Sequence, residues 1–231
     1  MRYKYIIIAS TLLISSCQSG QTVEQTLSPS ATPPSVQSQN LTGVAQIVSG
    51  NRFRNGAEIV TFAQDGTYRY SKNGFSTYTR WSAEGDSLCL HFERKRCSKL
   101  KHKGGERYGW SFRGRSEFSY QKLAGETVTG VGPIGPNDTI LPLADAQAYL
   151  RSKVHQLPNR AKISMTNTNR VKFVGRGRSN AATLSPQGNK LCGSFRIGSS
   201  TCISVVINNE RHFVVSERQS GRRTNKYMVL N

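Results

Sequence analysis

The nine residues Trp81-Ser-Ala-Glu-Gly-Asp-Ser-Leu-Cys89 recur 103 residues later as Leu184-Ser-Pro-Gln-Gly-Asn-Lys-Leu-Cys192. Four positions are identical, and the exchange of Asp86 for Asn189 suits the same turn. This common register indicates an internal duplication, and two copies are too few for a solenoid. The same offset aligns the apolar residues Val60, Phe62, Tyr68 and Tyr70 with Ile163, Met165, Val171 and Phe173.

Both copies have the alternating pattern of antiparallel strands. Residues 58–63 and 67–72 flank the turn Gln64-Asp65-Gly66. Residues 202–207 and 211–215 flank the turn Asn208-Asn209-Glu210. A helix is predicted at the start of each copy, over 143–154 and, shorter, over 41–48.

These patterns predict an α+β fold that is mainly antiparallel β. We expect two duplicated small domains, each a short helix plus a disulfide-pinned antiparallel sheet or small barrel. Copy one covers residues 41–123 and copy two covers residues 143–231. Residues 124–142 are rich in glycine and proline and are predicted to be a linker without an element of its own.

The N-terminus has the pattern of an export signal. Arg2 and Lys4 precede a short apolar segment that falls short of the about 20 residues needed to span a bilayer. Ile14-Ser15-Ser16-Cys17 resembles the lipobox of bacterial lipoproteins. The resemblance implies that residues 1–16 are removed as a signal peptide and that Cys17 is lipidated.

The residues after Cys17 bear on where the protein would be held. Gln18 stands where aspartate often marks inner-membrane retention, so the lipoprotein resemblance implies the outer membrane. Residues 17–40 are rich in Ser, Thr, Gln and Pro and lack apolar mass, which predicts a disordered tether behind the lipid.

Four cysteines remain in the two copies, namely Cys89, Cys97, Cys192 and Cys202. An even number in an exported chain favours disulfides, and three connectivities are possible. If each copy closes its own pair, the bridges are Cys89–Cys97 and Cys192–Cys202. Each would tie neighbouring strands and stabilise the fold by about 2–3 kcal/mol.

A second pattern lies between residues 41 and about 112. It consists of Gly50-Asn51, Asp65-Gly66-Thr67-Tyr68, Trp81, Leu88-Cys89 and Cys97. These residues resemble a small two-cysteine domain found in exported bacterial proteins of unassigned function. The resemblance implies a fold and a disulfide more than an activity. Copy two lacks the Asp-Gly-Thr and the tryptophan of this pattern.

Motifs for catalysis or metal binding are lacking. The cysteine pairs are eight and ten residues apart, unlike the short spacing of zinc ligands, and the four histidines are scattered. Asp65 and Asp86 fall in turns, where aspartate usually serves the backbone. No Gly-x-Ser-x-Gly elbow or P-loop occurs. We therefore expect a protein that is not an enzyme and holds no cofactor or metal.

Positive charge is the strongest remaining signal, with 32 Lys+Arg against 13 Asp+Glu and a net charge of +19. Tyr108 and Trp110 follow the cluster of copy one. The clusters are candidate anion-binding sites, the alternative being a solvated basic surface. They are Arg94, Lys95, Arg96, Lys99, Lys101 and Lys103 in copy one, and Arg176, Arg178, Arg222 and Arg223 in copy two.

Two function classes stay open on this reading. The first is a membrane-anchored cell-envelope lipoprotein that acts as a non-catalytic binding module for an anionic envelope polymer or a partner protein. Lipopolysaccharide and anionic lipid fit this location best, and DNA is the less favoured polyanion. The second is an envelope hydrolase whose site is assembled from residues distant in sequence.

Overall fold

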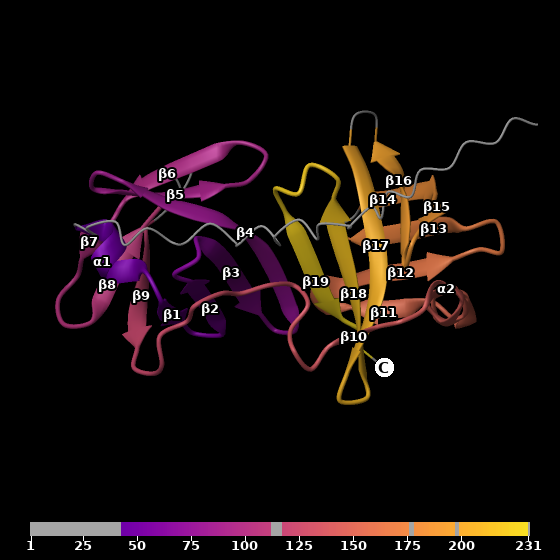
Figure 1. Cartoon of the computed structure of the whole chain (residues 1–231), viewed down its shortest axis with the longest axis horizontal. Helices are drawn as coiled ribbons and strands as arrows, with labels where there is room; N and C mark the ends of the chain where they lie inside the picture. Colours follow the sequence, from indigo (N-terminus) through magenta and orange to yellow (C-terminus); the bar gives the residue numbers. More distant parts are fainter. Residues whose placement is uncertain (1–42, 112–116, 176–177, 197–198, 231) are drawn as a thin grey trace, which may run out of the picture. The chain divides into compact units, whose positions relative to one another are not determined.

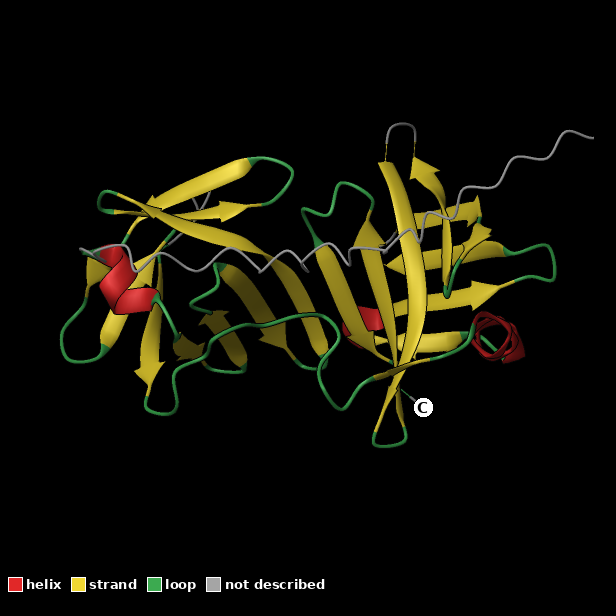
Figure 2. Cartoon of the chain, viewed as in Figure 1, coloured by secondary structure: helices red, strands yellow, loops and turns green. Residues whose placement is uncertain are grey.

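The computed structural model describes residues 43–111, 117–175, 178–196 and 199–230 (Figure 1). Helical structure in this part is limited to α1 (Val44–Val48), α2 (Leu143–Ser152) and the 3-10 turn η1 (Pro158–Arg160). The other elements are strands (Figure 2). The predicted signal peptide, Cys17 and the tether lie outside the described residues.

None of the described helices is long and apolar enough to cross a membrane.

The strands of copy one begin directly after α1. They are β1 (Asn51–Asn55), β2 (Glu58–Phe62), β3 (Thr67–Lys72), β4 (Phe75–Glu84), β5 (Ser87–His91), β6 (Lys95–Lys99), β7 (Lys101–His102), β8 (Arg107–Trp110) and β9 (Phe118–Leu123). The predicted strands over 58–63 and 67–72 are therefore confirmed. Between them, the Thr67 amide donates to Asp65 Oδ1 at 2.8 Å, and Gly66 takes a positive φ of 78° that suits glycine.

The strands of the linker and copy two follow. They are β10 (Thr139–Ile140), β11 (His155–Leu157), β12 (Ala161–Met165), β13 (Arg170–Gly175), β14 (Arg178–Thr183), β15 (Ser185–Gln187), β16 (Lys190–Arg196), β17 (Ser199–Asn208), β18 (Arg211–Arg218) and β19 (Thr224–Met228). The predicted hairpin over 202–215 is confirmed. Its turn residues Asn209 and Glu210 both have positive φ, the backbone of a tight primed turn.

Most strands belong to one antiparallel sheet of 15 strands. Its main order is β15-β16-β17-β18-β19-β4-β3-β2-β1-β9-β8-β7, with β10 on β17, β5 on β4 and β6 on β5. A second sheet has the order β11-β12-β13-β14. The architecture is mainly antiparallel β with few short helices, as expected. Because β19 pairs with β4, the large sheet runs from one copy into the other without a break.

The cross-strand pairing of copy one repeats in copy two at the offset of 103 residues. Turn geometry repeats as well, since the Trp81 amide donates to Gly66 O at 2.9 Å and the Leu184 amide to Asn169 O at 3.0 Å. The same sequence offset therefore gives the same strand register. Matched pairs are Thr67 opposite Arg80 with Arg170 opposite Thr183, Tyr70 opposite Thr77 with Phe173 opposite Asn180, and Ser82 opposite Cys89 with Ser185 opposite Cys192.

Each copy has its own apolar core. In copy one, Phe53 and Phe62 are fully buried and pack edge-to-face on one another and on Trp110. In copy two, aliphatic residues dominate, and Leu150 of α2 packs among them. These cores fix the hairpins whose outer faces carry the charged side chains.

The glycine- and proline-rich segment 124–142 differs from the prediction of an element-free linker. It contains β10, and its backbone is hydrogen-bonded to copy one. The Gln64 and Asp65 amides donate to Val128 O and Thr129 O at 3.0 and 2.9 Å. Proline and glycine disrupt local periodicity, but extended backbone of any composition can still pair with neighbouring groups.

Candidate anion-binding groove

The β5–β6 hairpin carries the first predicted cluster of cations. Leu88 and Leu90 of β5 are buried in the core, while Cys89 faces Cys97 on β6 and is bonded to it. In copy two, Cys192 of β16 is bonded in the same way to Cys202 of β17. Both predicted disulfides are thereby confirmed, and the first holds the base of the cationic hairpin.

Four of the six predicted cations of copy one are paired with carboxylates. In each pair the hydrogen bond from a lysine lowers the pKa of the carboxyl, so these acids stay ionised at neutral pH. The cluster therefore has less unbalanced charge than the sequence suggests. The pairs are Lys95 with Glu84, Lys99 with Asp86 at 3.1 Å, and both Lys101 (2.8 Å) and Lys103 (2.5 Å) with Glu117.

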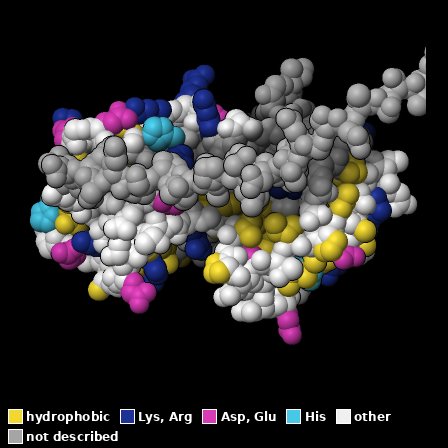
Figure 3. All heavy atoms as spheres, in the orientation of Figure 1, with side chains coloured by type: hydrophobic (Ala, Val, Ile, Leu, Met, Phe, Trp, Pro, Cys, Tyr) yellow, Lys and Arg dark blue, Asp and Glu magenta, His cyan; other side chains and the backbone are white. Residues whose placement is uncertain are grey.

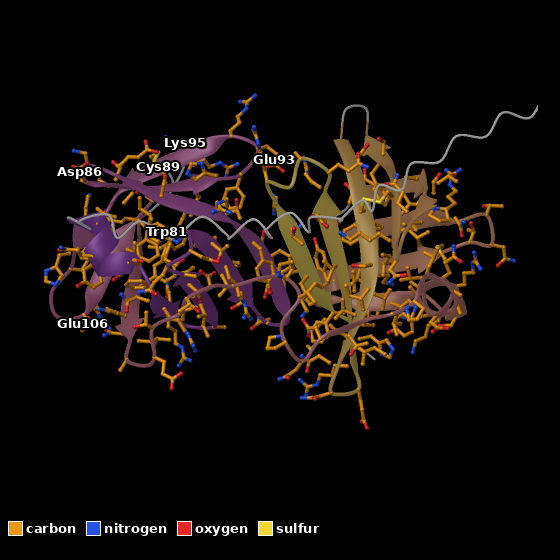
Figure 4. The ribbon with its side chains drawn as sticks, in the orientation of Figure 1. Trp81, Asp86, Cys89, Glu93, Lys95 and Glu106 are labelled. Atoms are coloured by element: carbon orange, nitrogen blue, oxygen red, sulfur yellow. A yellow bond between two sulfur atoms is a disulfide. The ribbon has the colours of Figure 1, made fainter. Side chains whose placement is uncertain are left out.

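The loop between β18 and β19 brings Arg222 and Arg223 to this hairpin. Arg218 Nε lies 3.1 Å from Glu93 Oε1 at the hairpin tip, which Figure 4 shows beside that loop. Thr79 Oγ1 lies 2.6 Å from His91 O and 2.8 Å from Arg222 O, so one hydroxyl joins both segments. Cations that are about 130 residues apart in the sequence are thus neighbours in the fold.

Phe92 contacts a cation from each copy. The guanidinium of Arg96 lies 5.4 Å from its ring centroid, and that of Arg223 lies 5.6 Å away. Arg223 Nε also donates to Thr77 Oγ1 at 3.3 Å and to Asn225 Oδ1 at 3.2 Å. Cation–π contacts of this kind stabilise by about 0.5–1 kcal/mol each and hold the two guanidinium groups close together.

Two adjoining hollows form what we call the seam groove. They have volumes of about 680 and 450 Å³ and share Ser220 and Arg222. In Figure 3, dark-blue Lys and Arg side chains gather along the edge that the β5–β6 hairpin occupies in Figure 1. The groove is lined by Arg80, Trp81, Ser82, His91, Phe92, Glu93, Lys95, Ser194, Ser200, Arg218, Gln219, Ser220, Gly221 and Arg222.

The structure brings only part of the predicted set together. Lys95 and Arg222 line the seam groove, and Arg94, Arg96 and Arg223 adjoin these residues in the chain. By contrast, Lys99, Lys101 and Lys103 are not among the lining residues. Arg176 lies outside the described residues, and Arg178 is described only as the backbone start of β14.

Sequence reasoning missed two parts of this groove. Arg80 and Arg218 are isolated cations in the sequence, and only strand pairing brings them to the clusters. Ser82 Oγ and His91 Nε2 lie 2.8 Å apart across β4 and β5. The Ser82–Cys89 register of the hairpin predicts that these side chains share a face, so a strand alignment would have found them.

Among the described residues, one cluster of side chains has the spacing of metal ligands, but its chemistry does not support a metal site. Glu84 lies near the sulfur atoms of Cys89 and Cys97, but the two sulfurs are bonded to one another. A disulfide offers no thiolate, the form of cysteine that binds metals.

Comparison with known proteins places the chain in no family. No family model matches, and no curated protein matches. Solved structures that resemble it include a putative DNA polymerase III beta subunit from Eubacterium rectale ATCC 33656, at 7% identity, a TM-score of 0.26 and 82% of this chain. Another is the DNA polymerase III beta chain of Streptococcus pneumoniae TIGR4, at 11% identity, a TM-score of 0.26 and 82% of this chain. The chain spans 58% and 59% of the length of these two proteins.

Proposed function

We propose that this chain is a lipid-anchored lipoprotein of the bacterial cell envelope whose seam groove binds an anionic polymer without catalysing a reaction. The lipobox at Ile14–Cys17 supports the anchor, and Gln18 supports the outer membrane. The observation that carries the binding role is the convergence of Arg80, Lys95 and Arg222 from distant segments on one groove.

The charge around the seam groove favours an anion. Glu93, its one acidic lining residue among those described, is already paired with Arg218, and the nearby Glu84 is paired with Lys95. Arg94 at the hairpin tip is exposed and has no carboxylate partner in the part of the chain that the structure describes. Unbalanced cations in a concave surface attract polyanions and raise their rate of association.

Lipopolysaccharide and anionic lipid are the ligands that match the proposed location. Their phosphate groups are suited to guanidinium groups, which offer paired donors in a fixed plane. DNA is a less favoured ligand, and a partner protein with an acidic surface is the alternative to a polymer.

Salt dependence tests the binding role. The probe is lipopolysaccharide, with single-stranded DNA as a second polyanion, titrated against the parent at several salt concentrations. Replacing Arg80, Arg94 and Arg222 by Gln is expected to weaken binding at least tenfold and to make the slope of log affinity against log salt shallower by about 2.

A control variant with the same change of charge separates the groove from general basicity. Lys99, Lys101 and Lys103 are paired with acids and do not line the groove, so replacing these three by Gln is expected to change affinity by less than threefold. Equal losses in both variants would show that only net charge matters. Absence of salt-dependent binding by the parent would leave the partner protein as the better proposal.

We further propose that the two copies arose by duplication, each as a short helix with a disulfide-pinned antiparallel sheet. The support is the shared register of strand pairs at one offset, together with the equivalent disulfides. Residues 41–123 and 143–231 remain the proposed copies. The shared sheet means that they act as one body within Ser38–Asn231.

An envelope hydrolase is a second candidate, favoured by the 2.8 Å contact of Ser82 Oγ with His91 Nε2 inside the groove. Ser82 Oγ also lies 3.2 Å from Glu84 Oε1, and no carboxylate hydrogen-bonds the His91 ring among the described residues. Labelling of the parent, but not of Ser82→Ala, by a fluorophosphonate would favour the hydrolase over the binding module.

A further inference from the structure

A larger cavity of about 800 Å³ lies at the opposite end of β18 from the seam groove. Arg211 and Phe213 at the start of β18 line this cavity, whereas Arg218 at the end of β18 lines the groove. On β4 the two sites come closer together, because Tyr78 of the cavity and Arg80 of the groove are two residues apart. They share no lining residue, and we call the larger one the strap cavity because linker residues between Gly132 and Asp138 line it.

The inner wall of the strap cavity is held by a buried ion pair. The Asp138 side chain is 2% exposed, and its Oδ2 accepts a hydrogen bond from Lys226 Nζ at 2.5 Å. Asn208 Nδ2 and the Gly135 amide donate to the same carboxylate, each at 2.7 Å. Lys226 Nζ also lies 4.6 Å from the centroid of Phe213. Linker, β17, β18 and β19 are therefore fixed together before any ligand arrives.

The charges that face this cavity do not balance. Lys226 is paired with Asp138, and Lys72 is paired with Glu58 at 3.0 Å. Arg69 and Arg211 also line it, and both are exposed. Within the described ranges, neither has a carboxylate partner. Two guanidinium groups thus remain available to a ligand that brings its own negative charge.

The other lining groups suit a ligand with hydroxyl groups. Asn73 and Asn209 stand in tight turns with positive φ, and Asn137 stands in the linker, so amides approach the cavity from different segments. The phenol of Tyr78 also lines the cavity and is protonated at neutral pH, since burial raises its pKa above the ordinary value of about 10. Amides and phenols both donate to and accept from hydroxyl groups.

We propose that the strap cavity binds an acidic oligosaccharide, whose sugar units carry carboxylates. Arg69 lies level with Glu217 but three strands away from it, and Arg211 is six residues further along β18. The two guanidinium groups would therefore hold carboxylates of different sugar units, and the asparagine amides would hold ring hydroxyls. The volume lies within the about 300–1,000 Å³ of small-molecule sites. This site is distinct from the seam groove proposed for the polyanion, because the two share no lining residue and the cavity recognises sugar units together with their charges.

Direct titration tests the proposal with the full chain. The probe is a tetramer of galacturonic acid, and a tetramer of galactose is the neutral control. Isothermal titration near physiological ionic strength is expected to show saturable binding of the acidic tetramer and at least tenfold weaker binding of the neutral one. Equal affinity for both, or no binding of the acidic tetramer up to 10 mM, would overturn the proposal.

Variants assign the binding to the strap cavity. Replacing Arg69 and Arg211 by Gln is expected to weaken the acidic tetramer at least tenfold. Replacing Arg52 and Arg54 by Gln, which removes two exposed cations of β1 that do not line the cavity, is expected to leave affinity within twofold.

The groove variant, with Arg80, Arg94 and Arg222 replaced by Gln, distinguishes the two proposed sites. It is expected to bind the tetramer like the parent. A loss of tetramer binding in this variant alone would place the saccharide in the seam groove and refute the strap cavity, whatever the groove does with polymers. Unchanged far-UV circular dichroism in every variant would show that the fold is retained. Tryptophan fluorescence does not serve here, because Trp81 lines the groove next to Arg80.

Discussion

Replacing Asp138 by alanine is expected to lower the free energy of unfolding by about 3–5 kcal/mol. The carboxylate is 2% exposed and its partner Lys226 is 13% exposed, so the change leaves a buried ammonium group without its counter-charge. Hydrogen bonds from the Gly135 amide and Asn208 Nδ2 are lost as well. Asp138→Asn keeps the shape and one acceptor, so its cost should be smaller, about 1–3 kcal/mol.

Urea unfolding, monitored by tryptophan fluorescence, measures this loss of stability with probes that lie far from the substituted residue. Trp81 and Trp110 both lie in copy one, whereas Asp138 ties the linker to copy two. With a slope of about 2 kcal/mol per molar urea, the midpoint should fall by about 1.5–2.5 M. The tryptophan signal should follow because β4 and β19 join both copies in one sheet.

The pH dependence of the same variant gives a second check. Burial raises the pKa of Asp138, but hydrogen bonds from Gly135, Lys226 and Asn208 outweigh it and hold the pKa below its ordinary value. The stabilisation is therefore fully present above the unfolded pKa of about 4 and is lost as the pH falls through the folded pKa. Parent and Asp138→Ala should converge in stability as the pH is lowered below about 4.

Three results would refute this reasoning. An unchanged midpoint would show that the ion pair does not stabilise the fold. A separate early transition in circular dichroism, with an unchanged tryptophan transition, would show that the copies unfold independently. An equal loss in the control Asp145→Ala would also count against it. Asp145 is exposed in the first turn of α2, and its removal should cost under about 1 kcal/mol.

Three further outcomes are expected. Cys17→Ser should abolish incorporation of labelled palmitate, and equal labelling of mutant and parent would contradict the lipobox assignment. Replacing Cys89 and Cys97 together by Ser should lower stability by about 2–3 kcal/mol in urea, and reduction of the parent, which also opens Cys192–Cys202, should lower it further. An unchanged midpoint in the variant would show that this bridge does not stabilise the fold. Burial lowers the pKa of His155, which is 1% exposed, so stability should be full above the unfolded pKa of about 6.5 and decline as the pH falls towards 5. His155→Asn should flatten that decline in a series of melting curves, and an unchanged slope would exclude His155 as its source.

Local elements of the fold could be predicted from the sequence because their signals are local. The turn at Asp65-Gly66 and the apolar alternation on both sides define the β2–β3 hairpin within 15 residues. The disulfides followed from the repeat, because equivalent cysteines in equivalent hairpins must close in the same way. These predictions required no knowledge of how distant strands pair.

The sequence predicted only part of one candidate site, namely Lys95 and Arg222 of the seam groove, because both sites depend on pairing between distant strands. Thr224 of β19 lies opposite Tyr78 of β4, a partner that no periodicity in either segment specifies. The ion pairs could not be predicted either. In the sequence Lys101 and Lys103 look like unpaired cations, and only the fold places Glu117 beside them. The burial of Asp138 was hidden as well, because aspartate in a glycine- and proline-rich segment is ordinarily a solvated turn residue.

The β4–β19 pairing joins the two copies of the proposed duplication, and both candidate sites depend on it. In copy one, β9 pairs with β1 of its own copy, whereas β19, the corresponding last strand of copy two, pairs with β4 of copy one. The β18–β19 loop is thereby brought to the β5–β6 hairpin, and the β17–β18 turn is brought to β3 and the linker. Neither candidate site would exist in one copy alone. A ligand of either site would therefore stabilise the joined pair of copies rather than one of them, and its binding should raise the unfolding midpoint of the whole sheet.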